Sequence, residues 1–161
     1  MISIEDRLRR LEDYEALRNL KARYAAYCDD NYDADSIASL FTIDAIWDGG
    51  PMGRGEGRDG IRELFLKSPG RMPFAIHYVT NPVIEIDGDR ATGRWYLWQP
   101  CVAAKDVVAP HEEAVWMGGV YSDQYVREND TWLFAHVQIE LKMLSPYQAG
   151  WAKQRFPEGF A

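Results

Sequence analysis

Cysteine is scarce in this chain of 161 residues, and long apolar runs are missing altogether. The two cysteines, Cys28 and Cys101, lie far apart and form no CxxC motif, which predicts free thiols rather than a disulfide framework. No apolar run approaches the roughly 18 residues that a membrane-spanning helix needs. The charged start MISIEDRLRRLEDYE is unlike a secretion signal. We therefore expect a cytoplasmic protein with no membrane partner.

Basic residues are fewer than acidic residues in this sequence. The 18 Lys and Arg residues stand against 25 Asp and Glu residues, and the formal net charge is −7. A nucleic-acid-binding surface is usually marked by a basic stripe, whereas the basic residues here are scattered among more numerous carboxylates. The charge pattern therefore predicts no nucleic-acid partner and no attraction to anionic membranes.

The sequence contains no motif for a phosphate cofactor, a nucleophilic serine or a metal site. It has no GxGxxG after a strand, no GxxxxGK[ST] and no GxSxG. Its three histidines, His77, His111 and His136, share no spacing that is typical of metal ligands. We therefore expect an enzyme with this sequence to work without cofactor or metal, using side-chain acids and bases.

The N-terminal part of the sequence has helical periodicity. Ser3 and Asp6 have the spacing of a capping box. Apolar residues then recur at helical intervals as far as about Cys28, which predicts a long first helix. A short second helix is predicted over DADSIASLF (33–41), and a third over RDGIRELFLK (58–67).

The rest of the chain is rich in β-branched and aromatic residues. Hairpin signals at 87–89 and 128–130 join two pairs of long predicted strands. The predicted strands are 43–48, 75–87, 90–102, 113–127 and 131–144. Helices followed by an antiparallel meander are typical of the α+β class. We predict a cone-shaped barrel, in which three N-terminal helices pack into a strongly curved, mainly antiparallel sheet.

A single domain is expected over residues 1–145, because the length suits one hydrophobic core. The remaining residues, 146–161, form a tail in which large aromatic rings occur without helical or strand periodicity. These rings are Tyr147, Trp151, Phe156 and Phe160. We expect the tail to lie across the mouth of the barrel or against a neighbouring subunit.

The predicted strand over EAVWMGGVYSDQYV (113–126) has apolar residues on both faces. Three helices cannot cover both faces of such a sheet, so another surface is needed on the outer side. A homotrimer is therefore expected, with a homodimer as the second choice.

Three stretches of the sequence resemble one known family. They are YEALRNLKARYAAYCD (14–29), AIHYVTNPVIEIDGDRATGRWYL (75–97) and GGVYSDQYVRENDTWLF (118–134). Each is similar to the corresponding part of the SnoaL-like branch of the nuclear transport factor two-like superfamily, and IHYVTN is the most specific piece. The resemblance covers nearly the whole chain, and it implies the same cone-shaped α+β fold.

The resemblance also implies a catalytic pair. In dehydratases and dehydrochlorinases of this family, a histidine at the position of His77 works with an aspartate at the end of the first helix. Aligning that helix selects Asp29, whereas counting back from the first strand selects Asp30; we prefer Asp29, because helical register is harder to shift than a loop. A catalytic tyrosine of the family falls on Tyr24. Taken separately, the sequence favours a core histidine for His77 and a helix-ending residue for Asp29; taken together within the matching motif, the two favour a catalytic pair.

Further side chains are candidates for the substrate-binding surface. Alternation along the strand at 90–102 places Trp95, Leu97 and Gln99 on one face. Trp47 ends the first strand, where such barrels present side chains to the pocket. On the last strand the candidates are Phe134, His136 and Gln138, which alternation places on one face with Trp132.

These residues favour a cofactor-independent lyase. A histidine supported by a carboxylate can remove a proton while a neighbouring group leaves as water or another small fragment. The many aromatic residues favour a hydrophobic cyclic or aromatic substrate. Two other readings remain open: an isomerase or polyketide-type cyclase that uses the same base, and a non-catalytic ligand-binding or assembly subunit of the same fold.

Overall fold

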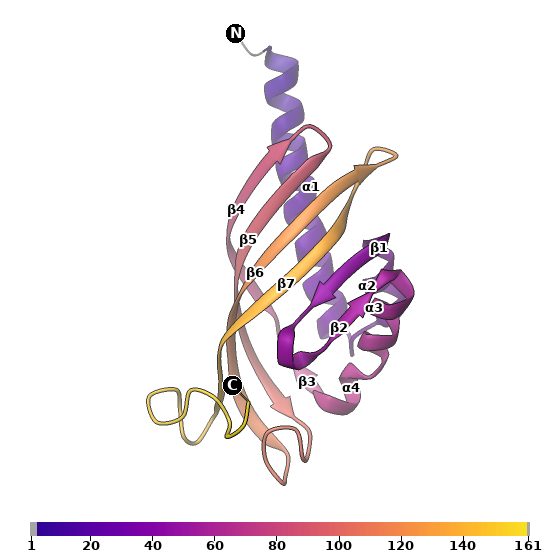
Figure 1. The fold of residues 1–161 in the computed structure, drawn as a ribbon. Helices are drawn as coiled ribbons and strands as arrows, with labels where there is room; N and C mark the ends of the chain where they lie inside the picture. Colours follow the sequence, from indigo (N-terminus) through magenta and orange to yellow (C-terminus); the bar gives the residue numbers. More distant parts are fainter. Residues whose placement is uncertain (1–2, 161) are drawn as a thin grey trace.

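The computed structural model describes residues 3–160, and Figure 1 shows helices packed along a long, curled sheet. The helices are α1 (Ile4–Asp29), α2 (Ala34–Ser39), α3 (Gly57–Leu66) and α4 (Ser68–Arg71), with a single 3-10 turn, η1 (Gly50–Met52). The strands are β1 (Phe41–Asp48), β2 (Arg54–Glu56), β3 (Phe74–Ala75), β4 (Tyr78–Asp87), β5 (Arg90–Ala103), β6 (Glu113–Glu128) and β7 (Thr131–Pro146). Within residues 3–160 no helix combines the length and the apolar character that crossing a bilayer requires.

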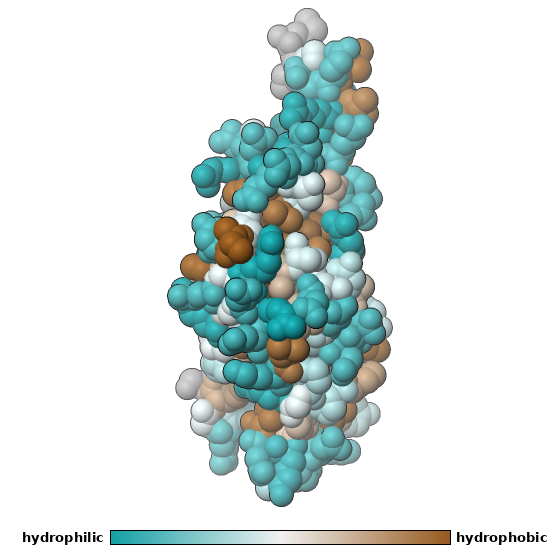
Figure 2. Space-filling view, turned by 90° about the vertical axis from the view of Figure 1, so that its right-hand side faces the viewer, coloured by the Kyte–Doolittle hydropathy of each residue, from teal (hydrophilic) through white to brown (hydrophobic). Residues whose placement is uncertain are grey.

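Helix α1 begins with the capping box that the sequence predicts. The Ser3 hydroxyl accepts a hydrogen bond from the Asp6 amide at 3.0 Å. The N-terminal part of α1 projects beyond the sheet (Figure 1), so its apolar residues Ile4, Leu8 and Leu11 are exposed instead of packing on the core. Figure 2 shows hydrophobic patches on this projecting end, on a face that is otherwise mostly hydrophilic.

The seven strands form one sheet in the order β2-β1-β7-β6-β5-β3, and β4 also pairs with β5. Every pairing is antiparallel except that of β1 with β7. The predicted α+β class with a mainly antiparallel sheet is therefore confirmed. In the described part of the chain, however, the sheet is curled without closing into a barrel. Helix α4 is not among the three predicted helices. Its residues Pro69 and Gly70 are typical of a turn, so the sequence gives no sign of a helix there.

The strand predicted over 75–87 is interrupted at Ile76 and His77. Strands β3 and β4 keep one register against β5, because Ala75 pairs with Cys101 and Tyr78 with Trp98. This register puts Ile76 opposite Pro100 and His77 opposite Gln99. Proline has no N–H group to donate to the ladder, so the regular pairing breaks opposite it. The Ile76 N–H still donates to the Pro100 carbonyl at 3.1 Å, so the next amide, that of His77, points away from β5 and can reach another acceptor.

Strand β7 contains a bulge that reverses its faces. Phe134 pairs with Tyr125, and His136 pairs with the preceding residue Gln124, so Ala135 has no partner on β6. Beyond the bulge, Val137 points into the core, whereas His136 and Gln138 lie on the outer side. The prediction that His136 and Gln138 share the face of Phe134 is wrong, because it assumed uninterrupted alternation.

The tail after β7 wraps around one end of the sheet. The Tyr147 ring lies 5.7 Å from Trp116, and the Trp151 ring lies 5.9 Å from Trp98. These four aromatic side chains form a cluster on the outer face of β5 and β6, which we call the outer aromatic cluster. Farther along the tail, Phe160 reaches the cavity described below.

Candidate active site

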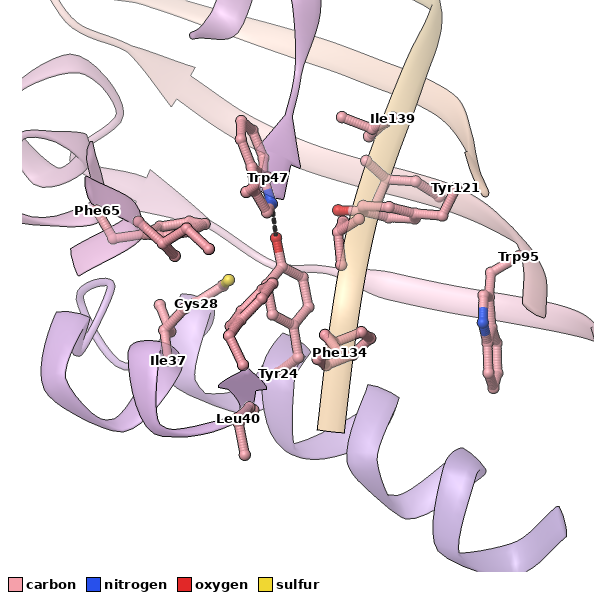
Figure 3. Close-up of a cluster of buried hydrophobic side chains, with 14 of the residues drawn as sticks. Tyr24, Cys28, Ile37, Leu40, Trp47, Phe65, Trp95, Tyr121, Phe134 and Ile139 are labelled. Atoms are coloured by element: carbon pink, nitrogen blue, oxygen red, sulfur yellow. Dashed lines mark hydrogen bonds between the residues drawn. The ribbon is translucent and has the colours of Figure 1, made fainter. Parts of the chain in front are cut away.

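A cavity opens between the end of α1, helix α3 and the inner face of the sheet. It has a volume of about 90 Å³, and most of its lining is apolar. Its buried lining residues include Tyr24, Trp47, Phe65, Leu97, Gln99 and Tyr121. Figure 3 shows Tyr24, Trp47, Phe65 and Tyr121 converging from four different elements. Cavities of this kind bind small hydrophobic molecules.

His77 lines this cavity and is bound to Asp29 at the end of α1. The distance from His77 Nδ1 to Asp29 Oδ1 is 2.7 Å, and the backbone N–H of His77 donates to the same oxygen at 2.9 Å. The histidine side chain is 6% exposed and the aspartate side chain 31%. Asp30 is the C-cap residue, and its backbone N–H donates to the carbonyl of Ala26. Asp29, and not Asp30, is therefore the carboxylate in contact with His77.

The contact with Asp29 determines what the His77 ring can do. An ionised carboxylate only accepts hydrogen bonds, so His77 Nδ1 is the protonated nitrogen of the neutral ring. Nε2 then carries the lone pair and is the nitrogen that can take a proton from a bound molecule. The carboxylate holds the ring in this tautomer and stabilises the imidazolium that protonation would form.

Tyr24 lies deep in the cavity and is tied to Trp47. The Trp47 indole N–H donates to the Tyr24 hydroxyl at 2.8 Å, the contact drawn as a dashed line in Figure 3. Burial raises the pKa of Tyr24 well above its usual value, and the neighbouring Tyr121 and Cys28 raise it further. The hydroxyl therefore stays protonated, and its own proton remains available for donation.

Tyr32 is a cavity residue that sequence analysis missed. Its ring lies 6.0 Å from the His77 ring, edge to face, and stacks on Phe65 at 6.2 Å. Tyr32 and Asn31 both have left-handed backbone, with φ values of 54° and 51°. Such a conformation is strained for a bulky side chain. The Asp-Asp-Asn sequence before it suggests a turn, but nothing in the sequence says that the turn aims Tyr32 at His77.

The other predicted binding residues divide into two groups. Trp47, Leu97 and Gln99 line the cavity. Trp95 and Phe134 are buried but do not line it, and Figure 3 shows Trp95 well apart from Tyr24 and Trp47. His136 and Gln138 lie on the outer side of β7, as described above, so none of these last four residues lines this cavity.

The buried cysteines are poor candidates for nucleophiles or metal ligands. Burial raises the pKa of Cys101 to about 12, and it raises the pKa of Cys28 further still. Both thiols therefore stay protonated at neutral pH. Among residues 3–160, no three His, Cys, Asp or Glu side chains gather as the ligands of a metal ion would.

Comparison with known proteins identifies the family. The profile of the SnoaL-like domain matches residues 9–138, which is most of the chain. The chain belongs to the SnoaL-like family. An uncharacterized protein of Mycobacterium tuberculosis, Rv2910c, is 29% identical over 133 residues, which cover 82% of this chain and 84% of that protein.

Two solved structures extend the comparison of this SnoaL-like protein. A candidate aromatic ring hydroxylase from Novosphingobium aromaticivorans is 31% identical, with a TM-score of 0.71 and coverage of 91% of this chain and 96% of that one. A hexachlorocyclohexane dehydrochlorinase, LinA-type3 from Novosphingobium barchaimii LL02, has a TM-score of 0.77 at 22% identity and covers 86% and 92%. At that identity the second likeness concerns the fold alone.

Proposed function

We propose that this protein is a cofactor-independent lyase acting on a small hydrophobic cyclic or aromatic compound. One observation carries the proposal: a histidine held by a carboxylate stands at the wall of a largely apolar cavity. A binding or assembly module gains nothing from a buried base with one free ring nitrogen. The dehydrochlorinase among the structures of this fold supports the proposal, because dehydrochlorination is also an elimination.

The proposed reaction begins with proton transfer to His77. Nε2 accepts a proton from a carbon of the substrate, and the electron pair of the broken C–H bond forms a double bond to the neighbouring carbon. The bond from that carbon to the leaving group breaks, and the leaving group departs with its electron pair. If the leaving group is a hydroxyl, the imidazolium returns the proton and water is released.

Asp29 and the two tyrosines have supporting roles in this proposal. Asp29 stabilises the imidazolium, and the effect is stronger in an apolar cavity than in water. Tyr24 and Tyr32 stay protonated and donate hydrogen bonds to the leaving group or to a substrate oxygen. Tyr32 is the one whose ring touches His77 edge on. Trp47, Leu97 and Gln99 hold the substrate ring.

A screen of compounds tests the proposed function directly. Hydroxylated and halogenated ring compounds are incubated with the wild-type protein and followed by mass spectrometry. We expect at least one to lose water or another small fragment, and the His77→Ala variant to leave it unchanged. Exchange of a proton for deuterium without any loss of mass would instead indicate an isomerase or cyclase. If no compound loses mass or exchanges a proton, the result favours the hypothesis of a non-catalytic binding subunit.

Two neighbouring aspartates should respond differently to the same substitution. We expect Asp29→Asn to lower kcat by about 10²–10⁴-fold, since the charge that supports the imidazolium is lost and an amide no longer fixes the Nδ1-protonated tautomer. Asp30→Asn is the matched control, and it should leave kcat close to wild type because only the Asp30 backbone takes part in the helix end. Steady-state kinetics on both variants show which aspartate supports His77. A larger loss in Asp30→Asn would overturn the assignment of Asp29.

We also propose that the protein is a homotrimer, with a homodimer as the second choice. Two apolar surfaces have no cover: the projecting end of α1 and the outer aromatic cluster. Size-exclusion chromatography with light scattering should give three times the chain mass of 18.5 kDa. A monomer at micromolar concentration contradicts the proposal.

The C-terminal tail is proposed to cover the catalytic domain. We propose residues 1–145 as the catalytic domain and residues 146–161 as a covering tail, of which the described residues 146–160 reach the cavity mouth and the outer face. Phe160 at the mouth and Trp151 on the outer aromatic cluster support this division.

A further inference from the structure

The rim of the cavity carries one fixed positive charge. The exposed Arg71 and the partly exposed Met52, Ser68, Val107 and Phe160 line the opening, and we call these five the rim. Arg71 is the only Lys or Arg side chain among all residues that line the cavity, and no Asp or Glu lines it. A ligand in this cavity therefore meets a cation at the rim and an apolar wall farther in.

Arg71 is held in place without being neutralised. Its Nη1 group donates to the carbonyl of Met52 at 2.8 Å, and its own carbonyl accepts from the Ala104 amide at 2.9 Å. No carboxylate of the described residues lies within 4.0 Å of its guanidinium. A guanidinium has five N–H donors, so most of them remain available to a ligand.

Ser68 adds a second donor on the same side of α4. It lies three residues before Arg71, which places the two side chains on one face of the helix, and both line the cavity. The Ser68 hydroxyl bonds to the Leu64 carbonyl only at a long 3.4 Å. Turning it toward a ligand oxygen therefore costs little.

From these contacts we infer that Arg71, with Ser68, forms a subsite for the carboxylate of the substrate. A planar carboxylate matches the fork of a guanidinium and can accept two parallel hydrogen bonds. The inference rests on the proposed function and narrows its substrate class to ring compounds with an acidic group. The ring occupies the apolar part of the cavity, and the carboxylate stays at the rim.

Electrostatics favours a specific subsite over general attraction. With a net charge of −7, the protein as a whole repels anions. A direct, bidentate contact is nevertheless much stronger than the attraction or repulsion of charges that lie more than a Debye length away. Arg71 can therefore outweigh the distant carboxylates only for an anion that it contacts directly.

A pair of matched probes tests the subsite without knowledge of the substrate. The probes are 2-naphthoate and its neutral analogue 2-naphthamide, titrated by calorimetry. We expect the wild-type protein to bind naphthoate at least tenfold more tightly, and Arg71→Gln to lose that preference while binding naphthamide as before. Ser68→Ala should reduce the preference by a smaller factor. Raising the salt concentration should weaken the binding of 2-naphthoate and leave the binding of 2-naphthamide unchanged.

A control variant separates the effect of Arg71 from a general loss of one positive charge. Arg62→Gln alters an arginine on α3 that pairs with Asp35 and does not line the cavity, so it should keep the preference. Equal affinity of the wild type for both probes, equal weakening of both by Arg71→Gln, or no binding of naphthoate overturns the subsite. Turnover of neutral ring compounds in the screen would then still support the lyase.

Discussion

His77→Ala should remove nearly all turnover and leave the fold intact. General-base catalysis typically supplies about 10²–10⁴-fold of an enzyme's rate, so we expect kcat on a substrate found in the screen to fall by at least that factor. The side chain faces a cavity, and its only hydrogen-bond partner, Asp29, is 31% exposed. Water can therefore solvate the carboxylate once the ring is gone, and the melting temperature should stay close to that of the wild type.

A purely structural histidine would give the opposite pair of results. Removing a core histidine leaves its partner buried and unsatisfied, which lowers stability and spares activity. His111→Ala is the matched control, because this histidine lies in the loop between β5 and β6, is largely exposed and pairs with Glu113. It should change neither kcat nor melting temperature. Full activity of a stable His77→Ala variant would falsify the proposed mechanism.

The resemblance to the SnoaL-like family predicts the contact between His77 and Asp29, whereas residue patterns alone place the two residues only on their elements. The end of α1 follows from the polar run after Cys28, and the hairpins follow from their turn residues, so Asp29 and His77 can be placed on their elements. Between β3 and β4 the strand is interrupted at Ile76 and His77, opposite Pro100, which has no N–H to donate to the Ile76 carbonyl. Pro100 is visible in the sequence and could have predicted this break.

Two other features depend on backbone geometry that residue patterns do not show. The bulge at Ala135 reverses the alternation of β7, and no glycine or proline marks it. The turn that aims Tyr32 at His77 uses left-handed backbone at a tyrosine, a residue that rarely adopts it. Both arise where tertiary packing determines a conformation against local preference. Strain of this kind is concentrated at functional sites, which agrees with the position of Tyr32 in the cavity.

A buried ion pair lies behind the cavity. Lys21 Nζ is 2.8 Å from Asp123 Oδ2, and the two side chains are 1% and 0% exposed. Tyr125 donates its hydroxyl proton to the same carboxylate oxygen at 2.8 Å. The ammonium group also lies 3.4 Å from the centre of the Tyr121 ring, which lines the cavity. The pair therefore supports one wall of the candidate site from within the core.

Burial works against both charges of this pair. It lowers the pKa of Lys21 and raises the pKa of Asp123, and in each case the charge of the partner opposes the shift. Each charge is thus tolerated in the core because the other is present. Removing one of them leaves the second without compensation, which is far more costly than removing both.

Lys21→Met should therefore lower the free energy of unfolding by about 3–5 kcal/mol, the usual effect of breaking a buried pair. Asp123→Leu should have a similar effect, whereas the double variant Lys21→Met/Asp123→Leu should recover part of the lost stability, because no uncompensated charge remains although the Tyr125 hydroxyl loses its acceptor. Urea denaturation of the three variants measures these differences. Arg62→Ala, which breaks the solvent-exposed pair with Asp35, is the control and should change stability little. If Lys21→Met unfolds at the same urea concentration as the wild type, the ion pair does not hold this wall of the cavity.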